Sequence, residues 1–125
     1  MKKHTFEYII KASPKILFNK LTTYAGLQQW FADKVFEKNN IYTFVWLNET
    51  LTAKIEIWNS NLVRFFWQND NDNPYIEFKI VTNELTNDLT LIISDFSNKD
   101  SEFNKDFWDV VITELKYAVG DNNNF

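Results

Sequence analysis

Residues 41–67 read IYTFVWLNETLTAKIEIWNSNLVRFFW, and this stretch decides the fold. Apolar side chains occupy every second position in three successive runs, a period typical of β-strands with a buried face. Polar residues at 48–49 and 59–61 interrupt the runs, as tight turns do. Strands joined by such short turns must be antiparallel, because a parallel pair needs a long crossover.

The alternation continues on both sides of this stretch. Residues 5–11, 75–81 and 89–96 predict further strands, and Val35–Phe36 predict the beginning of a weaker one. A meander of this length twists and curls, so that one of its faces becomes concave.

The C-terminal segment has the period of an amphipathic helix. Asp100 or Ser101 is suited to cap its start, and Gly120 is suited to end it. The apolar stripe of this helix must be covered, and only one face of the sheet is large enough to cover it. We therefore predict an α+β helix-grip fold, a curved antiparallel sheet wrapped around a long C-terminal helix. The stripe consists of Phe107, Trp108, Val111, Ile112, Leu115, Ala118 and Val119.

Two short helices are predicted between the first and second strands. Ser13 is a favourable N-cap and Pro14 suits the first helical position. Gly26 either ends this helix or allows a kink into a second short one that carries Leu27, Trp30 and Phe31. We expect a single domain over residues 1–125, with its core at about 4–119 and a flexible tail at 120–125.

Composition excludes several classes of function. The chain has 13 basic and 17 acidic residues and a net charge of -4, so nucleic acid is not an expected partner. The absence of cysteine excludes thiol chemistry and agrees with a cytoplasmic location. Two glycines cannot build a phosphate-binding loop, and the apolar runs are too short to cross a membrane. We expect no cofactor.

Few residues are candidates for catalysis. His4, the only histidine, is interpreted as a solvated side chain near the chain end, a poor position for a base. Glu77 and Arg64 point away from their apolar neighbours and predict a surface ion pair across two strands. Asp95 follows the inward alternation or lies at a rim, and Asp33 ends the helix pair or begins the next strand. We assign no catalytic residue and no metal site.

Aromatic residues make up 18% of the chain. The rings either fill a close-packed core or partly line a pocket for an apolar ligand, where the sheet curls away from the helix. The sequence leaves both interpretations open. The strand at 41–47 is apolar on both faces. The sequence leaves open whether both faces are covered within the domain or whether the outer face binds a partner. The predicted pocket walls are Trp30, Phe31, Phe65, Trp67, Phe78, Trp108 and Ile112.

Several short stretches resemble one family. They are SPKILF at 13–18, LQQWFAD at 27–33, VRFFW at 63–67 and Phe107–Trp108. With the order of elements, they resemble the START-like superfamily, also called SRPBCC or birch-pollen-allergen-like, over residues 4–119. Within it the chain looks most like bacterial proteins grouped with the activator of the heat-shock-protein-90 ATPase, in particular the short START-like domains of Bacteroidetes.

The resemblance implies binding of apolar molecules, since most members of this superfamily bind lipids, sterols or similar compounds. The leading hypothesis is thus non-enzymatic binding of a small apolar ligand between the sheet and the last helix. One alternative is a cochaperone-like protein-interaction module with a filled core. The other is an enzyme that uses a cavity carboxylate. We expect a monomer or weak dimer, with a small apolar ligand or a protein as partner.

Overall fold

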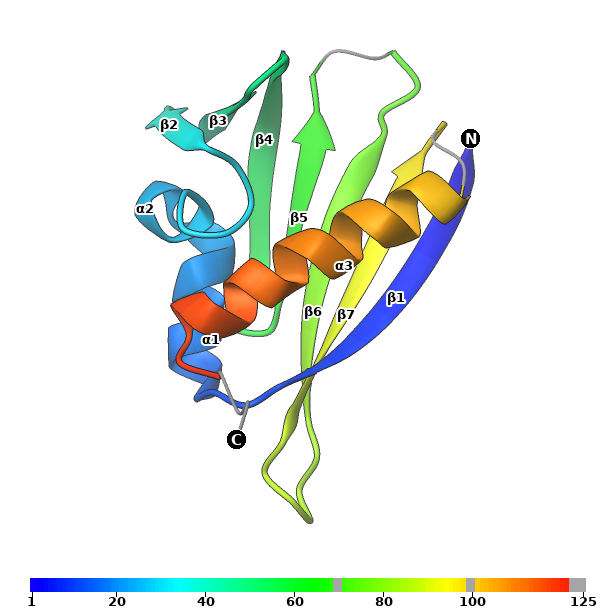
Figure 1. Ribbon diagram of the computed structural model, residues 1–125. Coiled ribbons are helices and arrows are strands. Elements are labelled where there is room, and N and C mark those ends of the chain that lie inside the picture. The colour runs from blue at the N-terminus through cyan, green and yellow to red at the C-terminus, as the bar shows by residue number, and fades with distance from the viewer. Residues whose placement is uncertain (69–70, 99–100, 122–125) are drawn as a thin grey trace.

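The computed structural model describes residues 1–68, 71–98 and 101–121. In this part of the chain seven strands form one antiparallel sheet in the order β1-β7-β6-β5-β4-β3-β2, and a long helix crosses its concave face (Figure 1). The predicted α+β helix-grip fold is therefore confirmed. The elements are β1 (Lys2–Ile10), α1 (Pro14–Thr22), α2 (Tyr24–Leu27), β2 (Lys34–Lys38), β3 (Ile41–Trp46), β4 (Glu49–Asn59), β5 (Leu62–Trp67), β6 (Tyr75–Thr82), β7 (Leu89–Ser97) and α3 (Ser101–Ala118).

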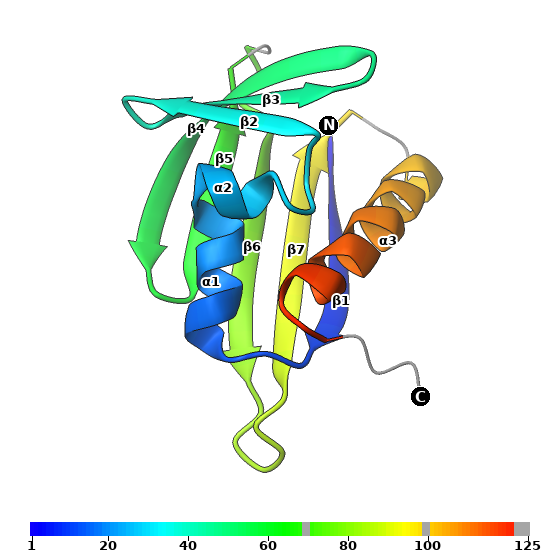
Figure 2. The ribbon, with the colours of Figure 1, turned by 60° about the vertical axis from the view of Figure 1, so that its left-hand side comes forward.

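The curvature of the sheet brings all three described helices to one side. Figure 2 shows β2 and β3 folding across the upper end of the sheet, with α1 and α2 beneath them and α3 alongside. The tight turn between β2 and β3 uses Asn39 and Asn40 at positive φ (53° and 66°), a conformation that asparagine tolerates. Between Ile57 and Asn59 the pairing of β4 with β5 shifts register, as it does at a β-bulge.

The end of α3 follows the predicted stop signal. Gly120 adopts φ +83°, its N–H donates to Tyr117 O at 3.1 Å, and the N–H of Asp121 donates to Lys116 O at 2.7 Å. This pair of bonds satisfies carbonyls that the last turn would otherwise leave free, as in a Schellman motif. Asp121 also accepts a bond from the N–H of Lys11, at 2.8 Å. Of the expected flexible tail, residues 122–125 lie outside the described residues, as does the alternative cap Asp100.

The beginning of α1 is as predicted, but its end is not. Ser13 Oγ accepts a bond from the N–H of Ile16 at 3.2 Å, and Pro14 is the first helical residue. The helix ends at Thr23, whose hydroxyl caps α2 by accepting from the N–H of Gly26 at 2.9 Å. Gly26 lies inside α2, and Trp30 and Phe31 follow that helix rather than belonging to it. A capping hydroxyl thus separates the two helices, a role that a search for helix-ending glycine misses.

The core lies between the concave face of the sheet and the helices. The inward positions of every strand contribute to it, as the period-two pattern predicts. On β3 the outward side chains of Ile41 and Val45 are half-buried, whereas Leu47 in the following turn is 89% exposed. The largest fully buried side chains are Trp108, Phe44, Phe65, Phe78, Ile10, Leu17, Leu21, Leu27, Ile76, Leu89, Leu91 and Ile93.

Candidate functional site

The seven predicted pocket walls belong to the hydrophobic core or pack against it, and they fall into two groups. Six of them retain at most 4% of their surface exposed, and Trp67 is partly exposed. A side chain that faces a void large enough for water keeps accessible surface there, so these six are covered by protein atoms in this conformation. Their assignment as ligand contacts stays a prediction. The six are Trp30, Phe31, Phe65, Phe78, Trp108 and Ile112.

The rings pack mainly edge to face around Phe31 and Trp108. These two are stacked with centroids 5.8 Å apart, and Phe78 meets Trp108 edge-on at 5.8 Å. Phe44 contacts Phe31 at 5.1 Å and Phe65 at 5.9 Å. We call Phe31, Phe44, Phe65, Phe78 and Trp108 the aromatic cluster. Offset and edge-on pairs are the favoured geometries of ring contacts, so the cluster is a stable apolar centre.

Two indole groups fix the loop that brings Phe31 into the cluster. Trp30 Nε1 donates to the carbonyl of Lys20 in α1 at 2.8 Å, and Trp46 Nε1 donates to the carbonyl of Phe31 at 2.9 Å. Both bonds satisfy backbone carbonyls while the rings remain in apolar surroundings. The segment between α2 and β2 is thereby held between α1 and β3.

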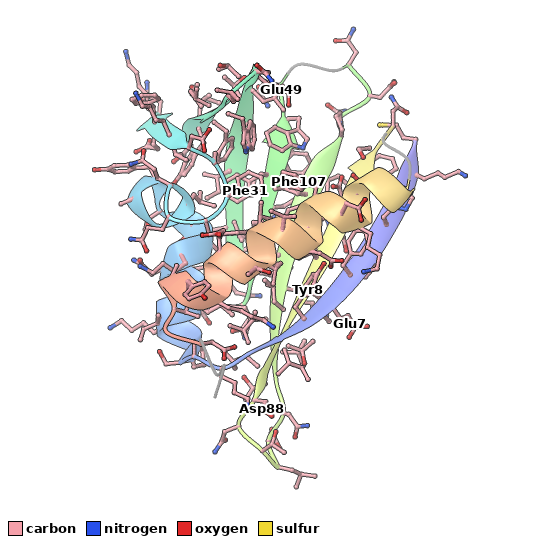
Figure 3. The ribbon with its side chains drawn as sticks, viewed as in Figure 1. Glu7, Tyr8, Phe31, Glu49, Asp88 and Phe107 are labelled. Carbon is pink, nitrogen blue, oxygen red and sulfur yellow. The ribbon has the colours of Figure 1, made fainter. Side chains whose placement is uncertain are left out.

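The cluster reaches the surface through three partly exposed rings, Trp46, Trp67 and Phe107. Trp46 lies 5.5 Å from Phe31 and Phe107 lies 6.0 Å from it, and Trp67 lies 5.7 Å from Phe44. Figure 3 shows Phe31 and Phe107 close together, at the side of α3 that faces the upper strand ends. We call Trp46, Trp67 and Phe107 the aromatic mouth. The sequence analysis did not name Trp46 and Phe107 among the predicted walls, although both belong to apolar patterns it recognised, Trp46 to the alternation with Phe44 and Phe107 to the helix stripe.

Beyond Trp108 the interior becomes polar. Trp108 Nε1 donates to Asp95 Oδ2 at 2.9 Å, and Asp95 is only 5% exposed. His4 pairs with Asp95 across β1 and β7, and Asn104 lies one turn before Trp108 on the same helix face. We call His4, Asp95 and Asn104 the polar end. The sequence analysis did not single out Asn104. It could have been found as an amide side chain four residues before Trp108, and therefore on the same face of the helix as the apolar stripe.

The interpretation of His4 as a solvated side chain at a loose chain end is wrong. His4 lies within β1, and its Nε2 atom is buried, with no hydrogen-bond partner among the described residues. The Nδ2 atom of Asn104, a residue 1% exposed, is in the same situation. Pairing with β7 orders the N-terminal strand from Lys2 onward, and the composition of the first residues does not reveal this pairing.

A second polar contact ties α3 to β1. Tyr8 donates its hydroxyl to Asp109 Oδ1 at 2.7 Å, and Lys105 Nζ contacts Asp109 Oδ2 at 2.7 Å. These bonds hold the pKa of Asp109 below its usual range, since both donors favour the charged carboxylate. Burial, together with the bond to Asp109, raises the pKa of Tyr8 well above its ordinary value. Tyr8 therefore remains a protonated donor at neutral pH.

Tyr8→Phe is expected to lower the free energy of unfolding at pH 7 by about 1 kcal/mol, the net value of one hydrogen bond. A carboxyl with a lowered folded pKa stabilises the fold above its unfolded pKa, here 3.8, and loses this effect as pH falls through the folded value. The difference between wild type and variant should therefore narrow in acid. Urea unfolding at pH 7 and pH 3 measures it. Tyr24→Phe, at an exposed tyrosine, should change nothing, and an undiminished difference in acid would contradict the assignment.

The two remaining candidate carboxylates, Glu77 and Asp33, have ordinary surroundings. Arg64 contacts Glu77 at 2.6 Å and faces it across β5 and β6, so the predicted ion pair is confirmed. Asp33 is exposed and directly precedes β2. Among the described residues, no group of three or more His, Cys, Asp or Glu side chains is arranged to hold a metal ion.

The described residues also line a hollow away from the aromatic cluster. It has a volume of about 360 Å³, is open to solvent and lies at the hairpin of β2 and β3. Phe36, 57% exposed, and Ile41 supply its apolar surface. Its full lining is Phe36, Glu37, Lys38, Asn39, Ile41 and Thr43.

Comparison with known protein families shows which family this chain belongs to. The family model of the START-like superfamily domain matches residues 1–121. The chain belongs to the START-like superfamily. No curated protein matches the sequence closely enough to lend this START-like domain a function.

Solved structures agree with the assignment of a START-like domain. A protein from Bacteroides fragilis is 33% identical, with a TM-score of 0.64 over 93% of this chain and 87% of that one. The Aha1 dimer from Colwellia psychrerythraea is 19% identical, with a TM-score of 0.79 over 99% and 100%. XoxI from Bacillus cereus is 13% identical, with a TM-score of 0.78 over the full length of both chains. The last two likenesses show the fold alone. Within the described residues, no helix combines the length and apolar character needed to cross a membrane.

Proposed function

We propose that this START-like domain binds a small apolar molecule between the concave face of the sheet and α3. The aromatic mouth is the observation that carries the proposal. Trp46, Trp67 and Phe107 keep part of their apolar surface in contact with water. Trp46 and Trp67 do so on the concave face of the sheet, the face that carries the aromatic cluster. Exposed ring surface costs roughly 25 cal/mol per Å², which a bound apolar molecule would recover.

Binding requires the rings to move apart. The aromatic cluster is covered in this conformation, so a ligand that enters through the mouth must replace ring contacts such as Phe31–Trp108 with its own. The predicted walls would then contact the ligand from three sides: Phe65 and Phe78 from the sheet, Ile112 from α3 and Trp30 from the segment after α2. Because the existing contacts are favourable, we expect moderate rather than very tight affinity.

A titration with a fatty acid, a sterol and a flavonoid tests the proposal. At least one of them should shift the amide signals of α3, β5 and β6 and change the tryptophan fluorescence. Trp67→Ala should weaken binding of that compound about tenfold, because a ring of the mouth is lost. Trp58→Ala is the matched control, since Trp58 is 55% exposed and stacks on Arg64 on the convex face. Unchanged amide signals with all three compounds, or equal losses in both variants, would refute the proposal.

A second candidate function is protein binding through the convex face. There the Arg64 guanidinium lies 5.0 Å from the Trp58 ring and 4.2 Å from the Tyr75 ring, and Phe66 and Phe96 extend the row. A second copy of this chain is one partner to consider, since the Colwellia relative was solved as a dimer. If the fluorescence of Trp58 changes with protein concentration, and none of the three compounds changes the signals of the aromatic mouth, protein binding replaces apolar-ligand binding as the proposed function.

A further inference from the structure

The polar end is an unusual feature of an otherwise aromatic interior. His4 and Asp95 stand opposite each other on β1 and β7, and Asn104 lies in the first half of α3, one turn before Trp108, whose indole contacts Asp95. Figure 1 shows this part of α3 beside the ends of both strands. Trp108 joins the two regions, because its indole N–H meets Asp95 while its ring stacks on Phe31.

Two atoms of the polar end are buried without a hydrogen-bond partner among the described residues. They are Nε2 of His4 and Nδ2 of Asn104. Buried polar atoms are nearly always paired, because an unpaired one has lost its water and gained nothing in exchange. An amide nitrogen can only donate, and Nε2 of a neutral imidazole donates or accepts according to its tautomer. A partner for Asn104 Nδ2 must therefore be an acceptor such as an oxygen, whereas a partner for His4 Nε2 can be an acceptor or a donor.

The surrounding charge favours a neutral oxygen. Asp95 is only 5% exposed and faces His4 directly, so an anionic group bound here would lie beside the oxygens of a buried carboxyl group. Lys105 cannot compensate, since its ammonium group is engaged by Asp109. A hydroxyl meets the requirement fully, because it can accept one bond and donate another.

We propose that the ligand is an apolar alcohol, bound with its hydroxyl at the polar end and its apolar part against Trp108 and the aromatic cluster. The inference rests on the proposed function, since it assumes an apolar molecule under α3. It adds the chemical class of that molecule and the two side chains that select it, His4 and Asn104.

Three probes of equal chain length test the inference: 1-decanol, 1-chlorodecane and decanoate. Decanol should bind about tenfold more tightly than the other two, which corresponds to the pairing of one buried donor. Decanol should also shift the side-chain amide signal of Asn104 in the wild-type protein, and chlorodecane should not. Asn104→Leu should bring decanol and chlorodecane within about threefold of each other. Glu114→Leu, on the exposed side of the same helix, should retain the preference.

The outcomes separate the two proposals. Equal binding of decanol and chlorodecane overturns the alcohol assignment and leaves apolar binding intact, and it is also the result expected if a trapped water satisfies both atoms. Tighter binding of decanoate overturns it in favour of an anionic head group. Failure of all three probes to bind overturns the alcohol assignment, whereas the proposed binding of an apolar molecule is decided by the titration with a fatty acid, a sterol and a flavonoid. The Asn104 signal is measured on the wild-type protein, so the test stands even if Asn104→Leu folds poorly.

Discussion

Trp108→Ala is expected to lower the free energy of unfolding by about 3–5 kcal/mol, the usual cost of removing a buried aromatic ring. Trp108 is 1% exposed and contacts Phe31, Phe78 and Phe107 at centroid distances of 5.8, 5.8 and 5.2 Å. Its removal leaves a cavity at the centre of the fold. It also removes the indole donor from the buried carboxylate of Asp95. Both effects act in the same direction.

Urea unfolding followed by circular dichroism measures this loss. Trp58→Ala is the matched control and should cost less than 1 kcal/mol, because Trp58 is 55% exposed. Trp108→Phe separates the two causes, since it preserves most of the ring packing but deletes the N–H donor. In Trp108→Phe, a further Asp95→Leu change should recover part of the loss. If Trp108→Ala and Trp58→Ala were equally mild, the aromatic cluster would not be the stabilising centre.

Gly26→Ala should be the second most damaging change, with an expected loss of about 2 kcal/mol. A Cβ atom at this position would lie 2.7 Å from Asn19 O and 2.7 Å from the Cα of Lys20. Both are backbone atoms of α1, so the two helices must move apart to admit a methyl group. The loop that holds Trp30 follows directly, and Trp30 Nε1 donates to the carbonyl of Lys20 in that same turn. The aromatic cluster should therefore be disturbed as well.

Gly120→Asn is the informative comparison for Gly26→Ala. A Cβ at Gly120 would meet nothing within 4 Å, and only its φ of +83° favours glycine. The positive-φ residues other than glycine in the described chain are all asparagines, at 39, 40, 73 and 87, so asparagine should be tolerated there. Thermal unfolding should show a large shift for Gly26→Ala and a small one for Gly120→Asn. The reverse order would show that close helix contact is not the reason for Gly26.

The strands were predictable because each has a local period. Alternation along β3, β4 and β5 identifies their buried side chains without any knowledge of the partner strands, and short polar turns require antiparallel pairing. The same holds for the apolar stripe and the glycine stop of α3. The ion pair of Arg64 and Glu77 was also predictable, since it needs only neighbouring strands and outward-facing positions.

The candidate site was harder to predict from the sequence. The period of the apolar residues shows which face of a strand or helix is apolar. It does not show how far a neighbouring helix extends over that face. Trp46 and Trp67 occupy inward positions like Phe44, yet they are partly exposed because of where α3 crosses the sheet. The polar end was missed for a similar reason. His4 is distant in the sequence from Asp95 and Asn104, and only the pairing of β1 with β7 brings it beside Asp95.

By itself, the sequence determined the order of the elements, the inner face of each strand and the need for a helix across the sheet. These properties follow from local periodicity and from capping residues, which act over a few neighbouring positions. Tertiary structure alone decided which rings close the aromatic cluster and which remain at the mouth. It also decided that Nε2 of His4 and Nδ2 of Asn104 are buried without a hydrogen-bond partner among the described residues. Burial and pairing of those side chains depend on contacts between β1, β7 and α3, at opposite ends of the chain, and such contacts exist only once the sheet has curled around the helix.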